Sequence, residues 1–220
     1  MNYHVFLDFD GTVTTEDVGY NFFKVFAEGE AEGIVKSYRD GEITAAQCLQ
    51  GECDIYNEYP APAMRVRQFI SSQKLTTGFK EFVEYCRNHD FSLTIISAGF
   101  DFYIRPILRR NGFDELEVFA NKTTIKNGRI YPEFTYYEEK TCPRCSNCKG
   151  LRIKELTGAD ETSVFIGDGH SDGHGARAAD IVFAKSFLAE YLQQAKINFF
   201  AFNNFFDIIE KFDNMLLKNG

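Results

Sequence analysis

The chain has 220 residues, enough for one large domain or for a core of ordinary size with a smaller insert. Its 24 basic and 32 acidic side chains give a net charge of −8, which argues against nucleic acid or an anionic membrane surface as a general partner. No apolar run approaches the roughly 20 residues that span a bilayer, and no signal peptide is visible. We therefore expect a cytoplasmic protein with no membrane partner; its oligomeric state is not indicated.

Short apolar runs rich in Val, Ile and Phe recur along the chain and predict buried strands. They lie at residues 3–7, 92–97, 116–120, 162–167, 180–184 and, with a weaker pattern, 196–202. Helical patterns fall between them, at residues 78–88, 102–112 and 149–158. This alternation predicts an α/β fold with a Rossmann-like, doubly wound parallel sheet, whose ligand site lies at the carboxyl ends of the strands.

Residues 15–75 break this rhythm, because they contain no strong strand and carry amphipathic stretches at 18–38 and 62–73. We expect a small helical cap over residues 15–75, inserted after the first strand, and an α/β core made by residues 1–14 and 76–220. Within the core, Asn127-Gly128 separates two strand-like pieces and predicts a β-hairpin over residues 122–134.

The first strand ends in two acids, Asp8 and Asp10, in the sequence "HVFLDFDGT". A carboxylate with an ordinary pKa near ~3.9 is ionised at neutral pH, so an aspartate can attack phosphorus without a partner base. Because carboxylate and phosphate repel each other, this chemistry calls for Mg²⁺, which prefers oxygen ligands. Alone, paired acids after a strand are equally well explained as a turn or a helix cap.

Further candidates follow two other predicted strands. Asp168 and Asp172 stand in "FIGDGHSD", after the strand at 162–167. Since parallel strands end at the same edge of a sheet, we expect both acids to meet Asp8 there. The strand at 92–97 ends in a hydroxyl followed by small residues, which would offer donors to a phosphate: Ser97, Ala98 and Gly99.

Two lysines precede Asp168 and compete for the task of neutralising a transferred phosphoryl group. Lys149 opens the predicted helix at 149–158, whereas Lys154 lies over a turn further in. We favour Lys149, because the start of this helix faces the same edge of the sheet.

Taken in order, the motifs DxDGT, Ser after the second core strand, a lysine and GDxxxD resemble those of haloacid dehalogenase superfamily phosphatases, over the whole chain. The insert and the segment "FANKTTIKNGRIY" resemble the branch that contains phosphoserine phosphatase. The resemblance implies that Asp8 is the nucleophile, and that Asp10 protonates the leaving oxygen and later activates water. It also implies that Ser97 and Lys149 hold the phosphoryl group.

The same resemblance implies a Mg²⁺ site formed by Asp8, the main-chain carbonyl of Asp10 and Asp168, with Asp172 supporting the metal. Thr12 would brace the first loop. The implied substrate-binding residues are Asp17, Ser97, Ala98, Gly99 and Lys149. From the residues alone, Asp17 is explained equally well as a helix cap.

The segment "TCPRCSNCKG" resembles two subgroups of this branch. One comprises the methionine-salvage phosphatases that act on 2-hydroxy-3-keto-5-methylthiopentenyl 1-phosphate, and the other the phosphoethanolamine and phosphocholine phosphatases. We favour the first, on segment similarity that includes "AGFDFYIRPIL", and keep phosphoserine as a further alternative. A phosphotransferase also fits the motifs. Asp10, as a proton donor for an ester oxygen, argues for phosphate esters over halides.

Cys142, Cys145 and Cys148 have the spacing of metal ligands. A zinc or iron–sulfur site would need a fourth ligand, from Cys86 or a distant histidine; the alternative is a loop of packed thiols. A different class of protein, a catalytically silent module that binds metal or a partner through this cluster, is the competing hypothesis. His170 and His174 flank Asp172, and their role is left open.

Overall fold

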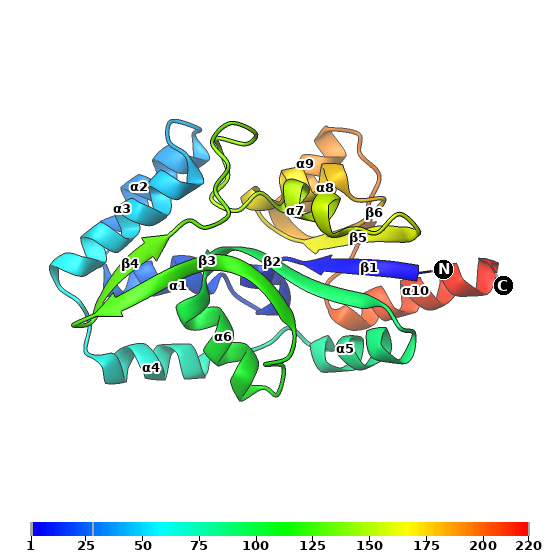
Figure 1. The fold of residues 1–220 in the computed structure, drawn as a ribbon, viewed down its shortest axis with the longest axis horizontal. Coiled ribbons are helices and arrows are strands. Elements are labelled where there is room, and N and C mark those ends of the chain that lie inside the picture. The colour runs from blue at the N-terminus through cyan, green and yellow to red at the C-terminus, as the bar shows by residue number, and fades with distance from the viewer. Residues whose placement is uncertain (1, 28, 220) are drawn as a thin grey trace. The chain divides into compact units, whose positions relative to one another are not determined.

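We describe the fold from a computed structural model, which covers residues 2–27 and 29–219. Over these residues, strands form one seven-stranded sheet in the order β4-β3-β2-β1-β5-β6-β7 (Figure 1). The strands are β1 (Asn2–Leu7), β2 (Ser92–Phe100), β3 (Glu117–Lys126), β4 (Arg129–Glu133), β5 (Glu161–Gly167), β6 (Ile181–Ala184) and β7 (Phe200–Ala201).

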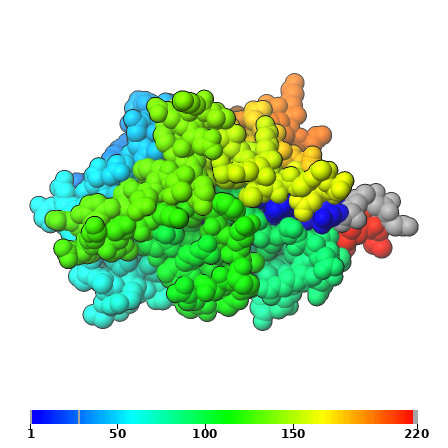
Figure 2. All heavy atoms as spheres, in the orientation of Figure 1, coloured from blue at the N-terminus to red at the C-terminus, as the bar shows by residue number. Residues whose placement is uncertain are grey.

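Strand β1 is the central strand and pairs in parallel with β2 and β5, so that Val5 lies beside Leu93 and Val164. Its residues from Tyr3 to Leu7 are buried, as expected for a strand covered on both faces. On the face shown in Figure 2, the blue of the N-terminal segment is seen as a small patch. Strands β6 and β7 continue the parallel pairing, which confirms the predicted α/β class.

The predicted hairpin is present as the antiparallel pair of β3 and β4, in which Lys126 lies opposite Arg129. The two turn residues both have positive φ, 50° for Asn127 and 78° for Gly128. Asparagine and glycine tolerate this conformation, and the resulting turn matches the twist of the two strands. The Asn-Gly pair therefore sets the register of the hairpin.

Helices connect and cover the strands. They are α1 (Val18–Phe26), α2 (Ala31–Arg39), α3 (Ala45–Glu58), α4 (Ala63–Ser72), α5 (Phe79–Asn88), α6 (Asp101–Arg110), α7 (Lys149–Leu156), α8 (Gly173–Ala178), α9 (Ser186–Gln194) and α10 (Phe205–Asn219). The predicted helical patterns correspond to α5, α6 and α7. Side chains fix two of the starts: Asp17 Oδ1 accepts a hydrogen bond from Tyr20 N at 2.8 Å, and Thr44 and Gln47 form a capping box on α3.

Two predicted boundaries were wrong. The weak strand at 196–202 is reduced to Phe200–Ala201, because Lys196 takes φ 56° and Ile197 N bonds back to Leu192 O, which uses these residues to end α9. Strand β2 runs on to Phe100, so residues 97–99 lie inside it. The amphipathic stretch 18–38 contains α1 and most of α2, in keeping with the helical insert that was predicted; residue 28 lies outside the described part.

Contacts divide the chain into two compact units, which we describe separately. Unit 1 comprises Met1–Thr15, Lys74–Ile95 and Lys149–Gly220, and its aromatic core includes Phe82 in tilted contacts with Phe205 and Phe212. Unit 2 comprises Glu16–Gln73 and Ile96–Cys148. Its core gathers rings around Phe22, namely Phe23, Phe26, Tyr56, Phe69 and Phe102.

The insert predicted at 15–75 is helical in the structure, as α1 to α4. Its role as a cap over a site stays a proposal. Among the described residues, no helix combines the length and the apolar character that crossing a membrane requires.

Candidate active site

The first loop of the site begins where β1 ends. Asp8 N donates to Ile166 O at 2.9 Å, which extends the pairing of β1 with β5 by one residue, and the Asp8 side chain is buried. The next residues, Phe9–Val13, form a tight turn that Thr14 N closes by donating to Phe9 O at 3.0 Å. Asp10 lies within this turn. The local sequence thus holds two acids directly at the carboxyl end of the central strand.

The second loop follows β5 and is organised around the Asp172 carboxylate. Asp172 Oδ2 accepts hydrogen bonds from Asp168 N at 2.8 Å and Gly169 N at 2.7 Å, which fixes the loop main chain. The Asp168 side chain accepts a hydrogen bond from Thr12 Oγ1 at 3.0 Å. Thr12 therefore ties the first loop to the second, so the carboxylates after β1 and β5 are brought together.

Glycine is required at position 11 for this approach. Gly11 has φ 80°, and a Cβ built there would lie 2.4 Å from Asp168 Oδ2. Any side chain would push the Asp168 carboxylate away, and an L-residue would also be strained in the left-handed region. The glycine of the DxDGT sequence is thus explained by the meeting of the two loops.

Lys149 supplies the cation of the cluster. It is the first residue of α7 and fully buried, and Nζ donates to Asp8 Oδ1 at 2.5 Å, to Ser171 Oγ at 3.0 Å and to Asp172 Oδ1. The competing Lys154 is exposed on the same helix. The structure therefore places Lys149, rather than Lys154, between two buried carboxylates.

Burial and crowding shift the pKa values of this cluster. Burial, followed by the Asp172 carboxylate, raises the pKa of Asp8 well above its ordinary value, and Lys149 opposes this. Burial and Asp172 raise the pKa of Asp168 to about 6. Burial acts to lower the pKa of Lys149, but the Asp172 and Asp8 carboxylates outweigh it and the pKa lies above its ordinary value. Burial therefore dominates the raised pKa values of the two aspartates, whereas neighbouring charges decide the direction for Lys149.

The carboxylate oxygens of the site are suitable ligands for a hard divalent cation such as Mg²⁺. One carboxylate oxygen from each of Asp8, Asp168 and Asp172 lies within 4.8 Å of the others. Three converging carboxylates beside one lysine leave negative charge that a bound cation would neutralise, and oxygen ligands are those that Mg²⁺ takes in phosphate-handling sites. The residues present therefore fit the expected Mg²⁺.

The remaining predicted site residues belong to unit 2. Ser97, Ala98 and Gly99 lie inside β2; the Ser97 side chain is buried, and its Oγ accepts a hydrogen bond from Gly99 N at 2.9 Å. Asp17 caps α1 through Tyr20 N, as one of the two alternatives predicted. The roles of these four residues toward a phosphoryl group stay predictions.

The histidines differ in their surroundings. His4 is structural: its Nε2 lies 2.9 Å from Thr94 Oγ1 and its ring stacks on Phe6. The His170 ring stacks on Phe187, with centroids 3.4 Å apart and planes at 11°. His174 is an exposed residue of α8.

Sequence reasoning missed Lys185. It follows β6 directly, and burial lowers its pKa while the carboxylates of Asp168 and Asp8 act in the opposite direction. A third strand of the parallel sheet thus delivers a charged residue to the same edge. The signal available was its position immediately after "IVFA", the same position that Asp8 and Asp168 hold after their strands.

Sheet and site together define a class of enzyme. Buried carboxylates at the carboxyl ends of two adjacent parallel strands, with a buried lysine between them, suit metal-assisted attack by an aspartate. A sequence model of haloacid dehalogenase-like hydrolases matches residues 5–177, and the chain belongs to this family.

Comparison with known proteins narrows the reaction. A 2-hydroxy-3-keto-5-methylthiopentenyl-1-phosphate phosphatase of Bacillus cereus is 28% identical over 98% of both chains, and one of Bacillus mycoides is 27% identical over the same shares. A solved structure of phosphoserine phosphatase with a phospho-aspartyl intermediate analogue superposes with a TM-score of 0.73 at 20% identity, over 96% of this chain and 98% of the other. Family and relatives make this chain a phosphatase.

Proposed function

We propose that the protein is a Mg²⁺-dependent phosphatase that hydrolyses a small phosphorylated metabolite through an aspartyl-phosphate on Asp8. The observation that carries the proposal is the burial of the Asp8 carboxylate 2.5 Å from Lys149 Nζ, within the group that it forms with Asp168 and Asp172. A silent binding module would gain nothing from keeping a buried lysine among three carboxylates, because burying such charges costs free energy.

In the first half-reaction an Asp8 oxygen attacks phosphorus, and the bond from phosphorus to the ester oxygen breaks. The leaving oxygen takes a proton from the Asp10 carboxyl group and departs as an alcohol. Lys149, whose ammonium is within hydrogen-bond reach of Asp8, offsets charge on the transferring group.

In the second half-reaction, Asp10 as carboxylate takes a proton from water, and the water oxygen attacks phosphorus. The bond between Asp8 and phosphorus breaks, which returns the Asp8 carboxylate and releases inorganic phosphate. The proton that Asp10 gave to the leaving alcohol is thereby restored, so a single acid serves both halves.

Asp8, the main-chain carbonyl of Asp10 and Asp168 would hold Mg²⁺, and Asp172 would support the site. When bound, the ion lowers the repulsion between the attacking carboxylate and the phosphate and polarises the phosphoryl oxygens. Asp172 contributes mainly by fixing its surroundings, because its two oxygens accept from Lys149 Nζ and from the amides of Asp168 and Gly169.

For the substrate we propose 2-hydroxy-3-keto-5-methylthiopentenyl 1-phosphate, in methionine salvage. The support is that relatives named for this activity align over 98% of both chains. We propose that Ser97, Ala98 and Gly99 donate to the phosphoryl oxygens, and that Asp17 contacts the leaving group. Residues 15–75 would act as the cap that excludes water and selects the leaving group. Phosphoserine and phosphoethanolamine or phosphocholine are the alternatives.

A panel of phosphate esters tests the proposal, with kcat/KM measured for the methylthiopentenyl phosphate, phosphoserine, phosphoethanolamine and phosphocholine. We expect the first to rank highest, with turnover that EDTA abolishes and Mg²⁺ restores. Asp8→Asn should lose at least about 1,000-fold in kcat, while Asp54→Asn, at an exposed acid of α3, should not change it.

The outcomes separate the reaction from the substrate. A different ester at the top of the ranking would overturn only the substrate. Turnover that persists in EDTA, or full activity in Asp8→Asn, would overturn the reaction.

A further inference from the structure

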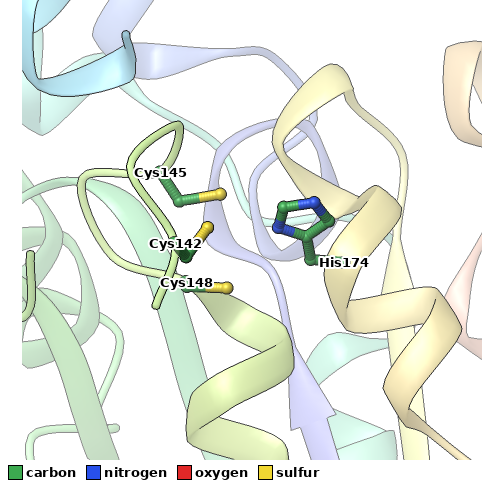
Figure 3. Close-up of side chains that lie close together, drawn as sticks. All are labelled: Cys142, Cys145, Cys148 and His174. Carbon is green, nitrogen blue, oxygen red and sulfur yellow. The ribbon is translucent and has the colours of Figure 1, made fainter. Parts of the chain in front are cut away.

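Three cysteines gather in the loop between β4 and α7. Cys142, Cys145 and Cys148 are each three residues apart, are in the thiol form, and place their Sγ atoms within 4.8 Å of one another. Figure 3 shows the three side chains extending from this loop with their sulfur atoms close together. No regular secondary structure brings these three side chains together, so their closeness in a loop points to a specific role.

The loop is anchored in a way that holds this arrangement. Cys142 N donates to Glu138 O at 2.7 Å, and Asn147 Nδ2 donates to the carbonyl oxygens of Ser97 and Phe119, each at 3.0 Å. Arg144 Nη1 donates to Gly41 O at 2.6 Å. One main-chain bond and three side-chain bonds thus hold the cysteine segment, and Cys142 and Cys148 are 6% and 5% exposed. A ligand at the sulfurs would therefore be shielded from water.

His174 is the fourth side chain drawn in Figure 3, and with the cysteines it makes a group of four metal-ligating residues. Within unit 1, the main chain of His174 packs against α7: a Cβ built on Gly150 would lie 2.5 Å from the carbonyl oxygen of His174. Gly150 follows Cys148 by only two residues. Cys148 is thus joined directly to α7, whose second residue packs against the main chain of His174, and the exposed His174 imidazole has nitrogen atoms that can bind a metal.

We propose that Cys142, Cys145, Cys148 and His174 hold a structural zinc ion. Three sulfurs and one imidazole nitrogen form a closed tetrahedral set of the kind zinc takes in structural sites. With Zn–S bonds of about 2.3 Å, sulfurs at the corners of a tetrahedron lie about 3.8 Å apart, so thiols that lie within 4.8 Å of one another need to close by at most about 1 Å. Iron–sulfur clusters are usually held by four cysteines, which makes zinc the better match.

The ion would stabilise the segment that delivers Lys149. Cys148 directly precedes Lys149, so a metal bound at its sulfur fixes the first turn of α7 and the approach of the ammonium to Asp8. With four protein ligands the zinc has no open position for substrate, so its role is structural. The inference thus goes beyond phosphate hydrolysis and does not depend on which ester is cleaved.

The test is metal analysis of the untagged full-length protein, purified anaerobically with a phosphine reductant. We expect about one equivalent of zinc per chain, and X-ray absorption showing three sulfurs at about 2.3 Å and one nitrogen near 2.0 Å. Cys145→Ser should lower the zinc content below about 0.2 equivalents, whereas Cys86→Ser, at a buried cysteine of α5, should retain it.

His174→Ala should weaken zinc binding at least about tenfold and remove the nitrogen ligand from the X-ray absorption spectrum. His170→Ala is the matched control. Circular dichroism establishes that each variant is folded. If Cys145→Ser does not fold, the unsubstituted protein can be loaded with cobalt in place of zinc. Charge-transfer bands from thiolate to cobalt then show that the cysteines bind the metal.

Three results would overturn the proposal: zinc below about 0.2 equivalents with no cobalt bands, iron and sulfide in place of zinc, or full zinc with unchanged coordination in His174→Ala. None of these readouts measures turnover, so their failure is distinct from failure of the proposed phosphatase reaction.

Discussion

Lys149 is the residue on which the electrostatics of the site depend. Its ammonium is fully buried and contacts the carboxylates of Asp8 and Asp172. Removing one partner of a buried ion pair leaves uncompensated charge, whereas removing an exposed charge costs little. The two lysines of α7 therefore give a matched comparison.

Lys149→Met should abolish turnover and lower the free energy of unfolding by about 3–5 kcal/mol at pH 8 in EDTA. The loss should be smaller at pH 5, because the pKa of Asp168 is about 6 and that of Asp8 is also raised, so these carboxyls take up protons there. Urea unfolding at both pH values measures this. Lys154→Met, at an exposed position, should behave like the unsubstituted protein; an equal loss in both variants would refute the buried pair.

Glu52 is a buried carboxyl group of α3 that the proposed mechanism does not use. Burial, followed by the charge of Asp17, raises its pKa to about 8, against about 4.3 in an unfolded chain. Between these values the folded protein binds the extra proton. The free energy of unfolding therefore falls as pH rises from about 4.3 to about 8, and this contribution is constant above that range.

Glu52→Gln keeps the shape of the side chain and is neutral at every pH. The free energy of unfolding of this variant should therefore lack the fall between about pH 4.3 and about pH 8 that Glu52 causes. We expect a melting temperature at least about 3 °C above that of the unsubstituted protein at pH 8, and little difference at pH 5. Thermal unfolding followed by circular dichroism measures both. Glu42→Gln removes an exposed carboxylate and serves as the control; a Glu52→Gln curve parallel to that of the unsubstituted protein at all pH values would count against the buried, protonated carboxyl.

At the scale of elements, the contact of α7 with α8 positions the lysine. Gly150 packs against the main chain of His174, and a Cβ there would lie 2.5 Å from a carbonyl oxygen that cannot rotate away. Gly33, within α2, has no atom within 4 Å of its Cβ position. The same substitution at the two sites therefore separates packing from helix propensity.

Gly150→Ala should destabilise the protein by about 1–3 kcal/mol and reduce kcat, because the two helices must move apart next to Lys149. Gly33→Ala should leave kcat unchanged and raise stability by up to about 1 kcal/mol, since alanine favours a helix. Denaturant unfolding and steady-state kinetics give both values. Equal effects at the two glycines would show that the contact of α7 with α8 does not matter.

The parts of the fold that sequence predicts well are those with a strong local signal. Strand β1 and its acids follow from a buried apolar run, and the hairpin follows from Asn127-Gly128. The carboxyl-end rule for parallel sheets correctly brought Asp8 and Asp168 together, although 156 positions separate Thr12 from its partner Asp168. Helix α8 was missed because a six-residue helix with two glycines has no usable pattern.

Tertiary context decided what sequence could not. Lys185 was overlooked because a lysine after a short strand is usually solvated, and only the position of β6 beside β5 brings it under the influence of Asp168. The end of β2 was misplaced because α6 begins at Asp101 with no intervening turn residue. For the three cysteines, by contrast, the sequence shows only their regular spacing, and the closeness of their sulfur atoms is seen only in the structure.

At the scale of the whole molecule, the protein is an α/β hydrolase of the haloacid dehalogenase-like family. We propose that its phosphatase chemistry uses the loops after β1 and β5, and α7 places Lys149 beside them. The cysteine loop immediately before α7 is proposed to carry a zinc ion. The proposed reaction rests on one claim, that Asp8 becomes phosphorylated during turnover.

Trapping the covalent intermediate tests that claim most directly. The protein is mixed with substrate and Mg²⁺, quenched in acid within milliseconds and reduced with borohydride, which converts an aspartyl phosphate to homoserine. Peptide mass spectrometry should then find homoserine at position 8 and at no other aspartate, and none in Asp8→Asn or without substrate. Homoserine at a different aspartate, or an unmodified position 8 in protein that turns over under the same conditions, would contradict the account.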